Sequence, residues 1–276
     1  MTLEYVGTVG LPPHVKDAGF DHAAVDSFRG RLYVAHTAND AIDIIDIVGE
    51  RHVGSVSGLT GVAGALVSPA DGLVFTSNRG ENTVGMFGPD SDDVTRIPVG
   101  VRPNGLAYDP DRNLLVAANV GHPGVAGSFT VSIVDIAARA LVGEIPVPGR
   151  TRWAVFDPVS RLFYVNIMDP PCVAVIDGAA RSLVRTFPSP VAGPHGLDLD
   201  VSRRRLFCAC DGGQLLAMSI ETGHVEKSAP LSGVPDVVFF NAELNHVYVA
   251  VGDPGVIDVF DALALHRIAT VKTGPG

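Results

Sequence analysis

The chain has 276 residues, of which 46% are hydrophobic and 18% are charged, and its formal net charge is −10 at pH 7. An excess of acidic residues repels a phosphate backbone, so we expect no nucleic-acid partner. No apolar run reaches the ~18 residues of a membrane span, and the N-terminus lacks the basic and apolar regions of a signal peptide. We therefore expect a cytoplasmic protein without a membrane partner.

One pattern recurs six times along the chain. Each copy has an apolar segment, a turn that often contains Asp-Pro, a segment like Arg-Leu-Tyr-Val, a segment like Val-x-Val-Ile-Asp, and a closing segment that ends near Gly or Pro. The central segments align on six residues about 41–48 positions apart, namely Tyr33, Val74, Leu115, Phe163, Phe207 and Tyr248. A period of ~40 to 50 residues with four short strands per unit is typical of β-propeller blades.

The elements are therefore expected in a fixed order. Residues 2–10 resemble the closing segments and are predicted to form an extra outer strand. Six repeats follow within a single domain spanning 1–276, at about 20–61, 62–102, 103–150, 151–193, 194–234 and 235–276. The pattern predicts an all-β fold of four-stranded antiparallel blades. Six blades are favoured because the chain has no further copy, and seven blades with one incomplete is the alternative.

In the third repeat the predicted strands are 106–108, 114–117, 130–134 and 141–147. Aspartates that end the third strand of four repeats are expected to form turns, and these are Asp46, Asp135, Asp177 and Asp261. The run Arg203–Arg205 falls in a hairpin turn and is expected to be solvated. Cys208 and Cys210 share one face of a strand and are expected to be packed thiols rather than a disulfide or a metal pair, and Cys172 makes the number of cysteines odd.

Two sets of segments carry a resemblance to a known family. Leu32–Ala35 with Ile44–Asp46, and Phe163–Asn166 with Val175–Asp177, resemble the YVTN-repeat β-propeller family. The opening segment Phe20–Asp26 also resembles the first-blade entry of many bacterial members, and the likeness covers about residues 20 to 272. The resemblance implies the propeller fold but no single function, because the family includes scaffolds, surface proteins and a few enzymes.

Functional residues are expected where the repeats differ. In a propeller, the loops that precede the first strands and follow the second strands emerge on one face around the central channel, which is the usual ligand site. Five of the six residues that enter the first strands are polar or ionisable, and in repeat order the six are His22, Gly64, Asn104, Arg152, His195 and Asp236. We expect a small-molecule ligand at this channel mouth.

Three interpretations of these residues stay open. His22, His195 and Asp236 can bind a divalent metal such as Zn²⁺ or another first-row ion, and no other cofactor is indicated. Without metal, the histidines can act as general acid–base groups while Arg152 binds a carboxylate or oxyanion and Asn104 donates a hydrogen bond. The third interpretation is a hydrated channel lining with no chemistry. The candidate catalytic residues are His22, His195, Arg152 and Asp236.

A second set of polar residues ends the second strands on the same face: His36, Asn78, Asn119, Asn166, Asp211 and Asp253. The Asn and Asp side chains are expected mainly to cap turns through Asx-type bonds. Trp153 follows Arg152 and can pack against a ligand or, more simply, against the core. The candidate substrate-binding residues are Asn104, Trp153, His36 and Asn119.

Two functional classes follow from these residues. The first is a small-molecule enzyme of hydrolase, lactonase or lyase type, with its His, Asp, Arg and Asn side chains at the channel mouth. The second is a non-catalytic propeller that binds a ligand or a protein. The concentration of polar residues at the mouth favours the enzyme, and the sequence does not fix an oligomeric state.

Overall fold

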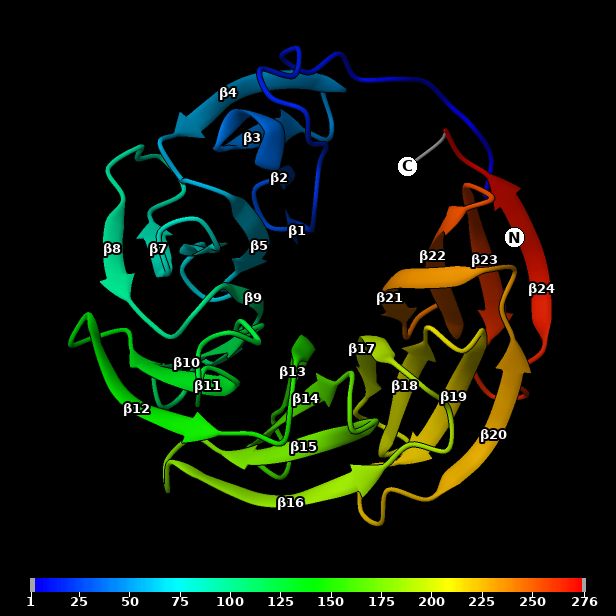
Figure 1. The fold of residues 1–276 in the computed structure, drawn as a ribbon. Coiled ribbons are helices and arrows are strands. Elements are labelled where there is room, and N and C mark those ends of the chain that lie inside the picture. The colour runs from blue at the N-terminus through cyan, green and yellow to red at the C-terminus, as the bar shows by residue number, and fades with distance from the viewer. Residues whose placement is uncertain (1–2, 275–276) are drawn as a thin grey trace. The chain divides into compact units, whose positions relative to one another are not determined.

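The computed structural model describes residues 3–274, so the ends of the predicted domain at 1–2 and 275–276 lie outside the described residues. Its strands are arranged in six four-stranded sheets (Figure 1). In every sheet the strands follow one another in chain order, and neighbouring strands are antiparallel. The predicted six-bladed β-propeller of four-stranded antiparallel blades is confirmed.

Residues 5–146 form one compact unit, which contains the first three sheets. The first sheet consists of β1 (Ala23–Asp26), β2 (Arg31–His36), β3 (Ala41–Asp46) and β4 (Arg51–Ser57), with a short 3₁₀ helix at Thr37–Asn39. The second consists of β5 (Val62–Val67), β6 (Val74–Asn78), β7 (Thr83–Phe87) and β8 (Thr95–Pro98). The third consists of β9 (Pro103–Asp109), β10 (Leu114–Asn119), β11 (Thr130–Asp135) and β12 (Ala140–Pro146).

Residues 147–274, grouped with residues 3 and 4, form the second compact unit and its three sheets. The fourth sheet consists of β13 (Thr151–Asp157), β14 (Leu162–Ile167), β15 (Cys172–Asp177) and β16 (Ser182–Pro188). The fifth consists of β17 (Pro194–Asp200), β18 (Arg205–Cys210), β19 (Gln214–Ser219) and β20 (Val225–Pro230). The sixth consists of β21 (Val234–Asn241), β22 (His246–Asp253), β23 (Val256–Asp261) and β24 (Arg267–Lys272).

Each sheet lies within one predicted repeat, apart from Val234, which begins β21 one residue before the predicted boundary. No helix in the described part of the chain is long and apolar enough to cross a membrane.

The extra outer strand predicted at residues 2–10 is wrong for the described residues of that segment. Residues 3–10 form no strand, and the side chains of Tyr5 and Val6 are 84% and 88% exposed. The reason is that every sheet already takes its fourth strand from its own repeat, β24 in the sixth sheet and β4 in the first. The likeness of this segment to the closing segments reflects local β propensity, which does not decide whether a segment pairs with a sheet.

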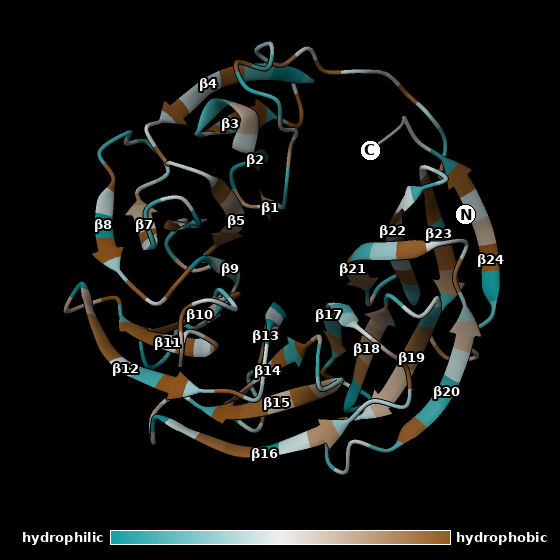
Figure 2. Cartoon of the chain, viewed as in Figure 1, coloured by the Kyte–Doolittle hydropathy of each residue, from teal (hydrophilic) through white to brown (hydrophobic). Residues whose placement is uncertain are grey.

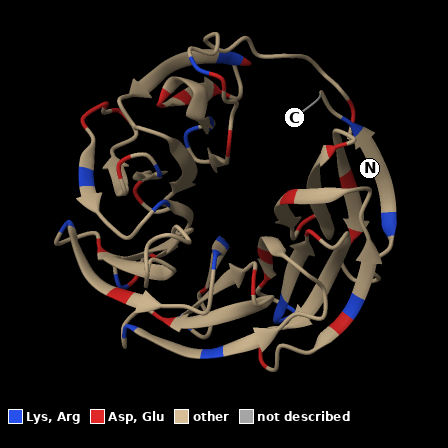
Figure 3. Ribbon diagram, viewed as in Figure 1, with Lys and Arg blue, Asp and Glu red and all other residues tan. Residues whose placement is uncertain are grey.

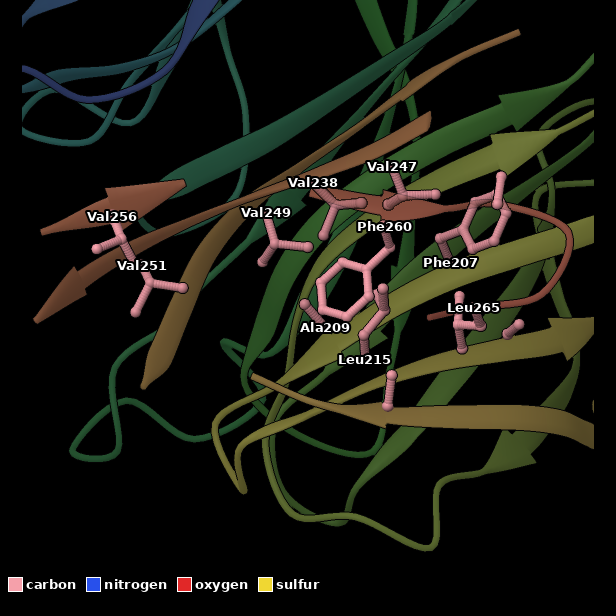
Figure 4. Packing of buried hydrophobic residues seen from close by; sticks show 13 residues of the cluster. Phe207, Ala209, Leu215, Val238, Val247, Val249, Val251, Val256, Phe260 and Leu265 are labelled. Atoms are coloured by element: carbon pink, nitrogen blue, oxygen red, sulfur yellow. The ribbon is translucent and has the colours of Figure 1, made fainter. Parts of the chain in front are cut away.

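The core lies between neighbouring sheets and is built from β-branched and aromatic side chains, which favour strands. Strand β15 is drawn almost entirely in the hydrophobic colour (Figure 2). Between the fifth and sixth sheets, Phe207 and Phe260 are both fully buried and lie in one cluster with Leu215, Val249 and Val251 (Figure 4). Burying each phenylalanine contributes roughly 1.5–3 kcal/mol, so packing between sheets is a main source of stability.

Charged residues lie mainly in turns and on the fourth strand of each sheet (Figure 3). The predicted turn role of the third-strand aspartates is confirmed. Asp177 accepts the backbone N–H groups of Ala179 and Ala180 at 3.0 and 2.9 Å, and Asp46, Asp135 and Asp261 accept N–H groups in the same way. The run Arg203–Arg205 is matched by carboxylates, because its guanidiniums pair with Asp200, Asp157, Glu221 and Glu226.

Cys208 and Cys210 are free and buried, as expected, and so is Cys172. The Sγ atoms of Cys208 and Cys210 lie 3.8 Å apart on β18. Burial raises the pKa of the Cys172 thiol to about 11, so this thiol stays protonated near neutral pH.

A β-bulge interrupts the pairing near the start of the first strand in the second to sixth sheets. The bulge leaves one or two residues outside the ladder and re-aims their side chains. The residues displaced in this way include four of the predicted entry residues, Asn104, Arg152, His195 and Asp236. The bulges therefore separate these polar side chains from the apolar faces of their strands.

Candidate functional site

Three predicted residues meet in the unit of residues 147–274. Arg152 is the second residue of β13, His195 the second of β17 and Asp236 the third of β21. These strands are neighbours, since β13 packs beside β17 and β17 beside β21. Asp211, the first residue after β18, completes the group, which we call the His195 cluster.

The imidazole of His195 lies between two carboxylates. Its Nδ1 is 2.7 Å from Oδ1 of Asp211, and its Nε2 is 3.3 Å from Oδ1 of Asp236. Nη2 of Arg152 lies 3.8 Å from Oδ2 of Asp211 and 3.5 Å from the sulfur of Met168. Asp211 therefore contacts both the histidine and the arginine, and its short bond to Nδ1 fixes the ring orientation.

The cluster is open to solvent on the Asp236 side. The side chain of Asp236 is 56% exposed, whereas those of His195 and Arg152 are both 17% exposed and that of Asp211 is 23% exposed. A small molecule that approaches from solvent thus reaches Asp236 and the Nε2 atom of His195 first. This geometry suits proton transfer at Nε2, because the other ring nitrogen is occupied by the partly buried Asp211.

Local backbone geometry brings Asp211 to the histidine. The N–H of Asp211 donates to the carbonyl of Gly193 at 2.8 Å, which ties the end of β18 to the segment before β17. Gly193 has φ of +66°, and a Cβ at this position would lie 2.7 Å from Cβ of Asp211. Only glycine satisfies both conditions. Asp211 was expected to cap a turn, and the sequence gives no local signal that it reaches His195.

Asp198, a carboxylate on β17, was not singled out from the sequence. Oδ1 of Asp198 accepts the N–H of Leu199 and Oδ2 accepts the N–H of Phe240 on β21, both at 2.7 Å. Burial raises the pKa of Asp198 to about 6, although these two hydrogen bonds act to lower it. Asp198 thus connects β17 to β21 three residues beyond His195.

Two more of the residues predicted at the entries of the first strands, His22 and Asn104, lie in the unit of residues 5–146. Nε2 of His22 is 3.2 Å from Oδ1 of Asp21, whose other oxygen is 3.1 Å from Nη1 of Arg79. Arg79 also donates from Nη2 to Oδ1 of Asn104. Asp21, His22, Arg79 and Asn104 form what we call the His22 cluster. Asp21 and Arg79 were not predicted; Arg79 follows directly after the second strand, as Asp211 does.

His36 and Asn119 are poorly placed to bind a substrate. Both side chains are fully buried. Nδ1 of His36 bonds Oδ2 of Asp43 at 2.7 Å, and the rings of His14 and Phe20 pack against it with centroids 5.0 and 4.4 Å away. The amide of Asn119 donates to the hydroxyls of Thr130 and Ser132 at 2.9 Å. Nδ1 of His36 and the amide nitrogen of Asn119 are thus bonded within the fold. Both side chains lie away from solvent, and their role in substrate binding stays a prediction.

Trp153 is partly buried and packs against the hydrophobic cluster between the fourth and fifth sheets. This contact matches the core role that was weighed against ligand binding. Among residues 3–274 no group of three or more His, Cys, Asp or Glu side chains has the arrangement of a metal site. Because His22 belongs to the other unit, the metal hypothesis for His22, His195 and Asp236 stays a prediction, and we derive no chemistry from it.

No protein-family model matches the chain, and no curated protein matches it. Among solved structures, hydrazine synthase from Kuenenia stuttgartiensis is similar, with a TM-score of 0.75 and 14% sequence identity. The match covers 96% of this chain and 90% of that chain. At this identity the likeness shows the fold alone, and it agrees with the β-propeller architecture.

Proposed function

We propose that the chain is an enzyme that acts on a small molecule at the His195 cluster, as a hydrolase or lactonase or as a lyase. The observation that carries the proposal is the placement of one imidazole between two carboxylates, of which Asp236 is the more exposed at 56% and Asp211 the less exposed at 23%. The contacts of Asp211 with Nδ1 at 2.7 Å and of Asp236 with Nε2 at 3.3 Å hold one imidazole in a fixed direction, which a merely hydrated surface does not require.

Each side chain has a role in this proposal. Asp211 accepts the Nδ1–H of His195, which leaves Nε2 to remove a proton from water or from a carbon next to a carbonyl. Asp236, beside Nε2, holds the attacking water or the substrate hydroxyl. Arg152 faces the same carboxylate as His195 and stabilises a substrate carboxylate or the oxyanion that forms.

Hydrolysis and elimination both start from proton removal at Nε2. In hydrolysis the activated water adds to an ester or lactone carbonyl, and the protonated histidine then returns its proton to the leaving oxygen. In elimination the histidine takes the proton next to a carboxylate, and the group on the neighbouring carbon leaves. The substrate class that fits both is a small carbonyl compound that bears a hydroxyl, ester or lactone oxygen.

A second candidate function is protein binding without catalysis. Phe28 and Val48, at the tips of two turns of the first sheet, are 85% and 88% exposed, and Val48 lies beside Gly30. Exposed apolar side chains of this kind are typical of interaction surfaces. If this candidate is right, the double variant F28S/V48S loses the partner while H195Q keeps it.

From the sequence resemblance, we also propose that the chain belongs to the YVTN-repeat β-propeller family. The regular six-fold repeat of four-stranded sheets supports this assignment, and it leaves both functional candidates open because that fold carries several functions.

The deciding experiment for the enzyme is a turnover screen of small esters, lactones and hydroxy acids with three proteins: wild type, H195Q and the control H224Q. His224 is an exposed histidine of the same unit. We expect H195Q to lose about 100-fold or more of kcat/KM with its melting temperature unchanged, and H224Q to behave as wild type. Equal turnover by H195Q and wild type would exclude His195 as the acid–base group.

A further inference from the structure

Asn166 on β14 touches the backbone on which His195 is mounted. Its Nδ2 donates to the carbonyl of His195 at 3.0 Å and to the carbonyl of Gly196 at 3.1 Å. Its Oδ1 faces the thiol of Cys208 at 3.5 Å. The side chain is fully buried, so both of its N–H donors are committed to the bulge that presents His195.

The orientation of this amide is determined by its partners. A rotated amide would place Oδ1 against two carbonyl oxygens, with no proton between them. The two accepted bonds therefore hold the carbonyls of His195 and Gly196 in one arrangement. These two residues lie outside the ladder, between the paired residues Pro194 and Leu197. Strand pairing with β18 therefore does not fix their position, and the bonds from Asn166 do.

The same position in the other sheets shows that asparagine is not needed for the fold. Asn166 pairs with Val173, the second residue of β15, and in every sheet one residue of the second strand pairs with the second residue of the third. The six residues at this position are Ala35, Ser77, Ala118, Asn166, Ala209 and Ala250. This position is thus occupied by alanine in four sheets and by a polar residue in two.

The second exception supports the same role. The Oγ of Ser77 donates to the carbonyl of Asn104 at 2.7 Å and accepts the N–H of Gly64 at 2.7 Å. Ser77 therefore holds the entry residue of the sheet that follows it, as Asn166 holds His195. In both units the polar exception lies next to a bulge that carries a residue of a polar cluster.

We infer that Asn166 is a positioning residue for His195. By fixing the two carbonyls of the bulge, it sets the direction of the imidazole toward Asp211 and Asp236. The catalytic meaning of this inference rests on the proposed function, whereas the structural claim can be tested without any substrate.

The test is a series in which the number of donors at position 166 falls stepwise. Asparagine has two donors to the bulge, N166S retains one and N166A has none. N166A also restores the residue found in four other sheets, so the variant is expected to fold. T270V is the matched control, because Thr270 loses a 2.8 Å hydrogen bond to buried Asp258 in the same unit without touching the His195 cluster.

The readout is the ¹⁵N chemical shift of the two ring nitrogens of His195, recorded at one pH on ¹⁵N-histidine protein and assigned with H195Q. We expect these shifts to move in N166A, to move less in N166S and to stay unchanged in T270V, at similar losses of melting temperature. Ring nitrogens that keep their wild-type shifts in folded N166A would overturn the inference. If N166A does not fold, unchanged ring-nitrogen shifts in N166S would overturn the inference instead.

Activity separates this inference from the proposed function. On any compound that wild type converts, N166A is expected to lower kcat while KM stays within about twofold. If H195Q retains full turnover, the proposed function fails, but shifted ring nitrogens in N166A still establish the positioning role. Wild-type kcat in N166A together with altered shifts would restrict Asn166 to a structural role.

Discussion

Arg79 and Asp211 occupy the same position in the second and fifth sheets but carry opposite charges. Each is the first residue after the second strand, and each donates its backbone N–H to a glycine carbonyl, that of Gly61 at 3.1 Å and that of Gly193 at 2.8 Å. Both glycines have a positive φ, +64° and +66°. One backbone arrangement thus supplies a cation to the His22 cluster in one unit and an anion to the His195 cluster in the other.

Replacing Asp211 with asparagine tests the orientation of His195. An amide can accept Nδ1–H through its oxygen or present its own N–H to Nδ1, so the charge that favours one tautomer and an imidazolium is lost. We expect D211N to lower kcat by about 100-fold or more on any converted compound while the fold is kept. D92N, a change of the same kind on an exposed loop, serves as the control. Unchanged kcat in D211N would contradict the role of Asp211.

Asp198 predicts a loss of stability as the pH rises. Its pKa of about 6 in the folded protein lies above the unfolded value of 3.8, because burial disfavours the charged form. The stabilising effect of the protonated carboxyl is therefore complete below pH ~3.8 and disappears as the pH rises through 6, at a cost of about 2–3 kcal/mol. D198N cannot ionise, so it is expected to gain stability relative to wild type between these pH values. Urea denaturation of both proteins at several pH values measures the free energy of unfolding. A difference between D198N and wild type that stays constant with pH would refute the prediction.

The ion pair of Arg204 with Asp157 predicts the opposite pH dependence. Nη1 and Nη2 of Arg204 each contact one oxygen of the buried Asp157 carboxylate at 2.8 Å. Burial alone would raise the pKa of Asp157, but the bonds from Arg204 and Ser160 outweigh it and lower the pKa to about 2. This stability is complete above pH ~3.8 and is lost as the pH falls through 2.

We therefore expect R204M to lower the free energy of unfolding by about 2 kcal/mol near neutral pH, and by less at pH ~2. R112M is the control, because Arg112 is 40% exposed and makes one 3.6 Å contact with Asp109. Denaturation of the two variants at both pH values measures the difference. An R204M effect that does not shrink in acid would show that packing, rather than charge, accounts for it.

Asp43 predicts that the first sheet depends on a buried carboxylate. Its side chain is 1% exposed and accepts hydrogen bonds from His36 at 2.7 Å and from Ser55 at 2.6 Å. D43N removes the charge and places an N–H group where an acceptor is needed, so we expect a loss of roughly 3 kcal/mol. D92N is again the control, because it makes the same substitution at an exposed position. Hydrogen exchange should show the loss in β1–β4, and equal protection in both variants would contradict it.

The sequence could predict the fold because its signal is repeated. Each copy carries the apolar segments and turn residues of four strands, so an error in one copy is corrected by the others. The entry residues Arg152, His195 and Asp236 were also predictable, because polar side chains beside apolar strands break the repeat. The segment at residues 3–10 misled because local β propensity does not decide whether a segment pairs with a sheet edge.

By itself, the sequence determined the number of sheets, the turns built on aspartate and the positions at which the repeats differ. These features depend on interactions within about ten residues, where periodicity and turn chemistry are decisive. Only the tertiary structure decided which polar side chains meet: that Asp211 holds His195, that Asn166 holds the bulge beneath it, and that His36 is buried against Asp43. Such pairs join neighbouring strands and sheets, and their geometry depends on registers and bulges that no local pattern encodes.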